Sequence, residues 1–114
     1  MKYALLIYTK PGSDEALGEA ELAALTREYY AIREDPRCVD GAHLGPVETA
    51  TTVRVKDGSM LTTDGPFADT KEVFGGYFVI DVPDLDQALE LAGRVPAARF
   101  GGSVEVRPVA ERAG

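Results

Sequence analysis

The residues with the clearest chemical potential lie between positions 62 and 72, between two segments of strand character. Asp64 is followed there by Gly65 and Pro66, which together indicate a stiff turn. A stiff turn suits a positioned carboxylate, and Asp64 could then serve as a general base or general acid. A purely structural turn, in which Asp64 bonds its own backbone, explains the same residues.

Two further side chains are candidates for an acid–base site with Asp64. His43 is the only histidine, and its side chain is the one whose ordinary pKa allows proton exchange near neutral pH. Tyr30 stands near the end of a predicted helix, where it could line a pocket. The alternative for His43 is a solvated or hydrogen-bonded histidine, and the neighbouring Tyr29 is interpreted as a core residue.

Three more residues are candidates for holding a substrate. Arg54 alternates with drier positions along its predicted strand, and its planar donor fork suits a carboxylate or phosphate. A surface arginine paired with a cross-strand acid is the alternative. Phe67 and Lys71, in the second part of the 62–72 stretch, complete the expected binding set, although Phe67 could equally plug the core and Lys71 could be solvated.

Length and composition place limits on the function. A chain of 114 residues predicts one domain, residues 1–114, and 12 basic against 19 acidic residues give a net charge of −7. Such an acidic chain repels phosphate backbones, so we expect no nucleic-acid partner. The single Cys38 excludes an internal disulfide, and one histidine with scattered carboxylates makes a poor metal site. We therefore expect neither a metal nor another cofactor, and we interpret Cys38 as a small buried hydrophobic residue.

The sequence predicts no membrane association. No apolar run approaches the roughly 20 residues that a spanning helix needs. The N-terminal segment has too short an apolar part, and no small-residue cleavage site, for a signal peptide. We expect a cytoplasmic protein.

The pattern of elements predicts an α+β fold. Strands are expected at residues 2–8, 76–82 and 104–109, and amphipathic helices at 16–34 and from about 84 to 93. Asp57-Gly58 predicts a hairpin between 49–55 and 59–63. Two helices cover one face of a mainly antiparallel sheet, and an uncovered apolar face favours a homodimer, with a pocket near the subunit boundary.

Several motifs of this sequence resemble those of a known protein family. Asp64-Gly65-Pro66-Phe67, Thr70-Lys71-Glu72 and Gly75-Gly76-Tyr77 together resemble the signature of the DGPF branch of the YCII-related family. The resemblance covers nearly the whole chain and implies a ferredoxin-like protein of the dimeric α/β-barrel type. Two departures bear on mechanism: the first helix lacks the histidine common in the wider family, and Asp69 stands where a glutamate is frequent.

Two function hypotheses follow. In the first, the protein is a cofactor-free enzyme of lyase or isomerase type, with Asp64 as acid or base on a small anionic or phenolic substrate. Some YCII-related proteins are dehydrochlorinases, which fits this chemistry. In the second, the protein is a non-enzymatic ligand-binding or regulatory module, because the resemblance associates this branch with alternative sigma factors.

Overall fold

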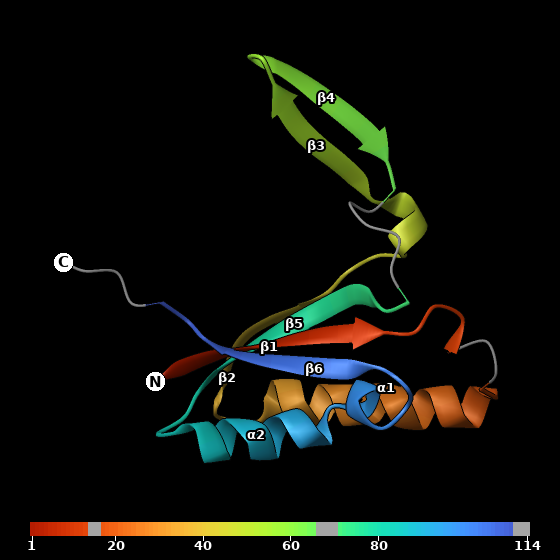
Figure 1. Cartoon of the computed structure of the whole chain (residues 1–114). Coiled ribbons are helices and arrows are strands. Elements are labelled where there is room, and N and C mark those ends of the chain that lie inside the picture. Colours follow the sequence, from red (N-terminus) through yellow and green to blue (C-terminus); the bar gives the residue numbers. More distant parts are fainter. Residues whose placement is uncertain (14–16, 66–70, 111–114) are drawn as a thin grey trace.

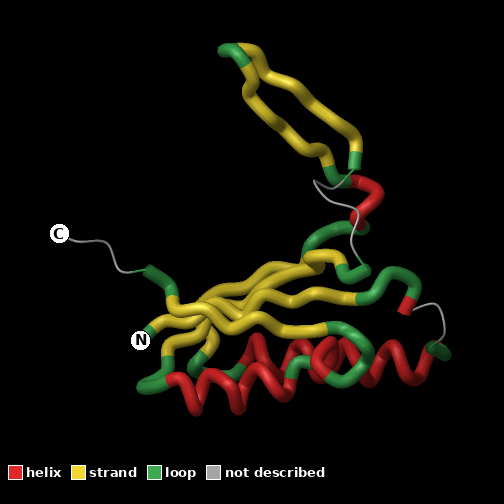
Figure 2. Tube along the Cα trace, viewed as in Figure 1, coloured by secondary structure: helices red, strands yellow, loops and turns green. Residues whose placement is uncertain are grey.

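The computed structural model describes residues 1–13, 17–65 and 71–110. It has three parts: a four-stranded antiparallel sheet, a helical layer on one face of that sheet, and a two-stranded hairpin that rises from the other side (Figures 1 and 2). The α+β class and the placement of both helices on one face are confirmed.

The sheet has the strand order β2-β5-β1-β6. Its strands are β1 (Lys2–Thr9), β2 (Cys38–His43), β5 (Val73–Asp81) and β6 (Ser103–Pro108). With the hairpin set aside, the chain runs strand, helix, strand, strand, helix, strand, which is the ferredoxin-like arrangement. The hairpin is an insertion between the second and third strands of that arrangement.

The helices are α1 (Glu19–Glu34) and α2 (Leu85–Arg94). Helix α1 begins at Glu19, later than the predicted residue 16, which lies outside the described residues; its predicted end before Pro36 is confirmed. Asp84 is the N-cap of α2, because its carboxylate accepts a hydrogen bond from the backbone N–H of Gln87. Short 3-10 helices occur at Val47–Thr49 and Pro96–Ala98. No helix within the described residues is both long and apolar enough to cross a membrane.

The core lies between the sheet and the helices. Strand β1 shows why: Tyr3, Leu5 and Ile7 are buried against the helices, whereas the intervening residues turn to the other face. The helices, strand β5 and the residues that directly follow them complete the cluster with Ile32, Phe78, Ile80, Val82, Ala88, Leu91, Ala92, Val95 and Ala97. The sheet therefore has one dry face and one face on which no described helix lies, here called the free face.

The inserted hairpin, here called the arm, consists of β3 (Thr51–Lys56) and β4 (Ser59–Asp64). Its turn confirms the prediction from Asp57-Gly58, since both residues have the positive φ that a type I′ turn requires, 52° and 77°. The sequence reads Val53 and Val55 as a drier face, yet both are exposed. The reason is tertiary: the arm stands away from the sheet.

Two adjacent glycines shape strand β5. Ile7 pairs with Gly76 and Tyr8 pairs with Phe74, so Gly75 is an extra residue that forms a bulge. A Cβ on Gly76 would lie 2.7 Å from the carbonyl oxygen of Ala42, so only glycine lets β2 approach this closely. The bulge allows pairing to continue past the glycines, and β5 therefore begins at Val73, earlier than the predicted residue 76.

Candidate functional site

One end of the sheet gathers the polar residues of the free face. Strand β1 ends just after Tyr8, β2 ends at His43, β6 begins at Ser103, and Glu72 immediately precedes β5. Because neighbouring strands run antiparallel, these four positions all fall at the same end. The arm leaves and re-enters the sheet at that end, between β2 and β5.

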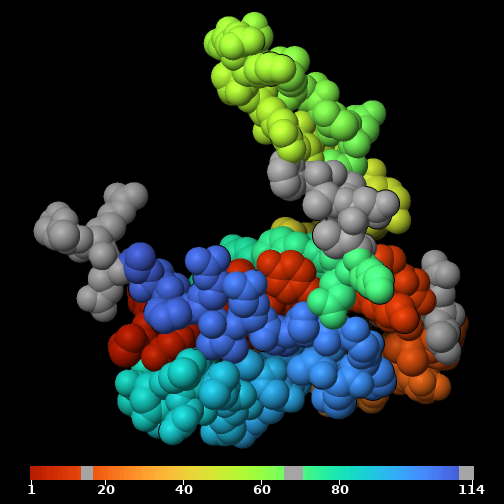
Figure 3. Space-filling model, viewed as in Figure 1, coloured from red at the N-terminus to blue at the C-terminus, as the bar shows by residue number. Residues whose placement is uncertain are grey.

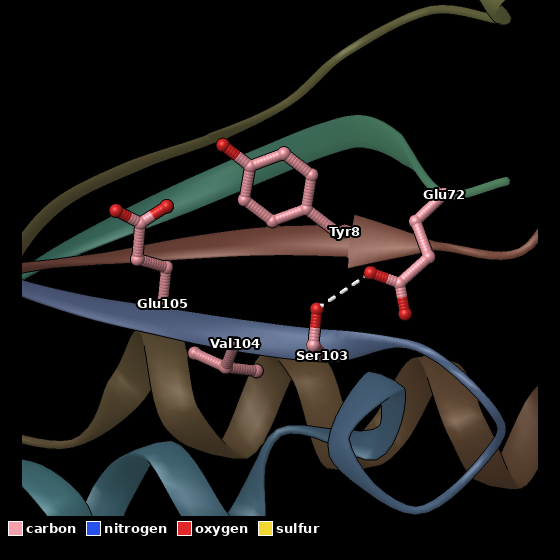
Figure 4. Close-up of a pocket in the computed structure, with 5 residues that line it drawn as sticks. All are labelled: Tyr8, Glu72, Ser103, Val104 and Glu105. Atoms are coloured by element: carbon pink, nitrogen blue, oxygen red, sulfur yellow. Dashed lines mark hydrogen bonds between the residues drawn. The ribbon is translucent and has the colours of Figure 1, made fainter. Parts of the chain in front are cut away.

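A shallow hollow of about 340 Å³ lies at this end of the free face. It is lined by Tyr8, Glu72, Ser103, Val104 and Glu105. Figure 4 shows the Tyr8 ring and the Glu105 carboxylate rising from the free face, while Val104 points toward the helices. The Oγ of Ser103 donates a hydrogen bond to Oε2 of Glu72 at 2.8 Å, which ties the start of β6 to the residue before β5.

An aromatic pair borders the hollow. The rings of Tyr8 and Phe74 lie with their centroids 5.6 Å apart and tilted by 57°, a favourable arrangement for two aromatic side chains. The site therefore combines an apolar aromatic wall with the carboxylates of Glu72 and Glu105. Such a lining suits a flat molecule with hydroxyl groups, because carboxylates accept hydrogen bonds from O–H donors.

Asp64 lies at the base of the arm. It is the last residue of β4, it pairs with Thr51, and its side chain is exposed. The backbone after it is held by two hydrogen bonds: Gly65 N–H donates to Ala50 O at 2.7 Å, and Thr52 Oγ1 donates to Gly65 O at 2.8 Å. Gly65 has a φ of 97°, a conformation that favours glycine. The stiffness predicted for this turn is thus present up to Gly65.

The other two predicted acid–base residues fall in different places. His43 is exposed at the end of β2, the same end of the sheet as the hollow and the base of the arm. Tyr30 is 60% exposed on α1, in the helical layer on the opposite face of the sheet. Within one chain, the topology therefore brings Asp64 and His43 to one end of the molecule and leaves Tyr30 on the far layer.

The predicted substrate-binding residues are also separated. Arg54 pairs with Leu61, so it lies on the opposite face of the arm from Asp64. Lys71 is exposed and directly precedes Glu72 of the hollow. Phe67 lies outside the described residues.

The sequence reasoning missed the hollow. The sequence predicts Tyr8 only as the end of a strand and Glu72 only as part of a family motif, and it predicts no role for Ser103. The hollow forms from three segments far apart in sequence, and only the pairing of β1 with β5 and β6 brings them together. The alternation of residues in the sequence places Glu105 on the polar face of its strand. It does not show which residues of the neighbouring strands lie beside Glu105.

Three titratable residues in the described part of the chain have shifted pKa values, and none of them lines the hollow: Asp35, Arg37 and Cys38. Arg37 donates hydrogen bonds to Asp35 from its side chain and its backbone, which lowers the pKa of that carboxyl to about 2. Burial raises the pKa of the Cys38 thiol, which packs against the core but is half-buried, not fully buried as predicted. In the described part of the chain, no group of three or more histidine, cysteine, aspartate or glutamate residues is arranged to hold a metal ion.

Comparison with known proteins identifies the family. The YCII-related domain matches residues 1–112. An uncharacterized protein of Rhizobium meliloti (strain 1021) is 36% identical over 117 residues, covering 96% of this chain and 93% of that protein. Among solved structures, 5-chloro-2-hydroxyhydroquinone dehydrochlorinase from Burkholderia phenoliruptrix AC1100, in complex with 2,5-dihydroxybenzoquinone, aligns with a TM-score of 0.54 over 98% of this chain and 96% of that one. At 14% identity this likeness shows the ferredoxin-like fold alone. The chain belongs to the YCII-related family.

Proposed function

We propose that this protein binds a small phenolic molecule in the hollow of the free face and acts on it by acid–base chemistry, without a cofactor. The observation that carries the proposal is the lining of the hollow, where two carboxylates stand beside an aromatic pair. Of the two substrate classes expected from the sequence, this lining favours the phenolic one. A carboxylate substrate would be repelled by Glu72 and Glu105, whereas a phenol donates a hydrogen bond to either.

Asp64 is the proposed acid–base group. A carboxylate next to a bound phenol or enol can remove a proton and return it at a neighbouring carbon, which is the requirement for isomerisation or for elimination of a leaving group. The rigid backbone around Gly65 holds Asp64 at the end of the molecule where the hollow lies. The dehydrochlorinase of the same fold was solved in complex with 2,5-dihydroxybenzoquinone, which supports this choice of substrate class.

The remaining predicted site residues keep supporting roles in the proposal. His43 is the proposed proton-exchange partner, because it lies at the same end of the sheet. Lys71 is proposed to bind substrate beside Glu72. Tyr30 lies in the helical layer on the opposite side of the sheet from the hollow, and Arg54 lies on the face of the arm opposite Asp64, so the proposal gives neither a role within one chain. Assignment to the DGPF branch stays a prediction from the motif.

A binding protein without turnover is the second candidate function. The observation that favours it is the exposure of Asp64, because its carboxylate is open to solvent and is not enclosed with a substrate, as binding alone allows and catalysis rarely does. Both candidates predict that phenols bind. They differ in whether Asp64 changes the bound molecule.

The experiment measures binding and turnover together in matched variants. Hydroquinone and a chlorinated hydroquinone are titrated into the wild type, Asp64→Asn and Glu72→Gln, with Asp57→Asn at the tip of the arm as the control for the same chemical change. We expect Glu72→Gln to weaken binding about tenfold, the loss of one hydrogen bond to a charged group. Asp64→Asn should bind normally and release no chloride.

The outcomes separate the candidates. If the wild type binds the phenols but does not convert them, the protein is a binding protein and not an enzyme for this substrate class. Phenols that fail to bind the wild type, or that bind equally well to Glu72→Gln, would reject the hollow as the site. Benzoate serves as the anionic comparison and is expected to bind more weakly than hydroquinone.

A further inference from the structure

The hydrogen bond between Ser103 and Glu72 joins two segments that are not neighbours in the sheet. Ser103 is the first residue of β6 and Glu72 directly precedes β5, and β1 lies between these two strands. The outer two of three adjacent strands lie about 10 Å apart, yet the Oγ of Ser103 donates to Oε2 of Glu72 at 2.8 Å. The Glu72 side chain therefore reaches across the end of β1 to accept this hydrogen bond, as Figure 4 shows.

The backbone that carries Ser103 is held tightly against β1. Gly101 has a φ of 83°, which favours glycine, and the N–H of Gly102 donates to the carbonyl oxygen of Ala97 at 3.0 Å. A Cβ on Gly102 would lie 2.2 Å from the carbonyl oxygen of Tyr8, so this turn packs directly on the end of β1. Ser103 then pairs with Tyr8, and Figure 3 shows side chains of β6, in blue, beside those of β1, in red. The hydroxyl of Ser103 is therefore a donor on a rigid support.

The two partners of this hydrogen bond differ in conformational freedom. A serine side chain has one rotatable bond that places its oxygen, whereas a glutamate side chain has three and loses far more conformational entropy when it is held in one orientation. Glu72 is half-buried and lies just outside the regular part of β5. The short donor on the rigid turn therefore sets the orientation of the long acceptor.

The same turn also places the second carboxylate of the hollow. Glu105 lies two residues after Ser103, so the two side chains share the free face of β6. Tyr8, opposite Ser103 on β1, carries the ring that lines the hollow together with both glutamates. A carboxylate accepts several hydrogen bonds at once, so its bond to Ser103 does not prevent Glu72 from accepting another from a phenol.

We propose that Ser103 is a positioning residue of the phenol site: its hydroxyl holds the Glu72 carboxylate across the end of β1, in the orientation that receives a hydroxyl group of the ligand. The inference rests on the proposed function, to which it adds a residue that acts through Glu72 and not on the ligand itself. A carboxylate that is already oriented spares the ligand the entropic cost of ordering it, and binding is tighter for that reason.

The first test compares two variants of the same shape. Ser103→Thr keeps the hydroxyl group and Ser103→Val lacks it, and both residues suit a strand. In calorimetric titrations with hydroquinone, Ser103→Thr should bind within about twofold of the wild type and Ser103→Val about fivefold more weakly, less than the loss expected from changing Glu72 itself. Ser59→Val makes the same change at an exposed position of the arm and should leave the affinity unaltered. Equal affinities of the threonine and valine variants would overturn the proposal.

A double-mutant cycle tests whether Ser103 acts through Glu72. Ser103→Val is introduced into the wild type and into Glu72→Ala, which lacks the carboxylate. If Ser103 only orients this carboxylate, its replacement should weaken hydroquinone binding less than about twofold in the Glu72→Ala background, because nothing is left to position. A fivefold loss in both backgrounds would show that Ser103 acts on the ligand or on the fold, and would overturn the positioning role.

A measurement without ligand separates this inference from the proposed function. Three-bond coupling constants of the Glu72 side chain, measured by NMR, should report a single rotamer in the wild type and in Ser103→Thr, and averaging over several rotamers in Ser103→Val. Averaged couplings in the wild type, or couplings that Ser103→Val leaves unchanged, would overturn the positioning role even if hydroquinone binds. The expected couplings in a protein that binds no phenol would reject the proposed function and leave Ser103 as the residue that orients Glu72.

Discussion

Asp64 and Arg54 lie on opposite faces of the same hairpin. Asp64 pairs with Thr51 and shares its face with Val53 and Val55, whereas Arg54 pairs with Leu61 on the other face. The sequence suggested that these two residues act on one substrate. Within one chain they are turned away from each other, so a single small molecule cannot contact both.

This separation predicts independent effects on ligand binding. In a double-mutant cycle with Asp64→Asn and Arg54→Gln, the changes in the binding free energy of hydroquinone should add to within about 0.5 kcal/mol, as expected for residues without a shared partner. Calorimetric titration of the wild type, both single variants and the double variant measures the coupling. A coupling above about 1 kcal/mol would show that both side chains reach one ligand.

The two adjacent glycines of β5 should respond differently to the same substitution. In Gly76→Ala the new methyl group would lie 2.7 Å from the carbonyl oxygen of Ala42, and this backbone atom cannot move aside without disturbing β2. We expect a loss of about 1–3 kcal/mol in the free energy of unfolding. Gly75→Ala is the control, because its methyl group would meet Thr9 at 3.5 Å, an ordinary contact. Equal losses in urea unfolding would contradict the close approach of β2.

Removing the N-cap of α2 should destabilise the fold by about 1 kcal/mol. Asp84 accepts a hydrogen bond from the backbone of Gln87 at 3.0 Å, and Asp84→Ala leaves this N–H without its partner. Asp86→Ala, two residues further along the same helix turn, changes the charge equally without removing the cap. The melting temperature of Asp84→Ala should be clearly lower than that of Asp86→Ala. The reverse order would refute the capping role of Asp84.

The Asp35–Arg37 pair should make stability depend on pH in acid. The pKa of Asp35 is about 2 in the folded chain and about 3.8 when the pair is broken. A lowered pKa means that the folded state favours the charged carboxylate, so the contribution is complete above about pH 5 and is lost as the pH falls from about 4 to 2. The side chain is 17% exposed, and solvent screening limits the contribution to about 1 kcal/mol.

The measurement compares urea unfolding of the wild type and Asp35→Asn at pH 7 and at pH 2.5. The variant should be less stable than the wild type at pH 7, and the difference should shrink at pH 2.5. The neighbouring exposed Glu34→Gln serves as the control and should change stability little at either pH. A difference that grows in acid would contradict the lowered pKa.

Local chemistry in the sequence predicted local structure well. Asp57-Gly58 predicted the hairpin turn correctly, because a two-residue turn depends only on residues that are adjacent in the sequence. A doubled glycine inside a strand pattern is typical of a bulge or a close approach, and residues 75 and 76 mark both.

The site could not be predicted in the same way. The hollow depends on Tyr8, Glu72 and Ser103, which only the pairing of β1 with its two neighbours brings together. Helical periodicity placed Tyr30 beside the apolar stripe of α1, but it could not show that this helix covers the far side of the sheet from the hollow. The alternation of apolar and polar residues in β3 likewise predicts a drier face, but it cannot show that the arm stands away from the sheet.

The most direct test of the proposed site is a titration of the ¹⁵N-labelled protein with hydroquinone, followed by the chemical shifts of its assigned backbone amides. The account predicts that the largest changes occur at Tyr8, Glu72, Ser103 and Glu105, and that Glu72→Gln reduces them at the same ligand concentration. Changes confined to the helical layer, or no change at saturating hydroquinone, would contradict a phenol site on the free face.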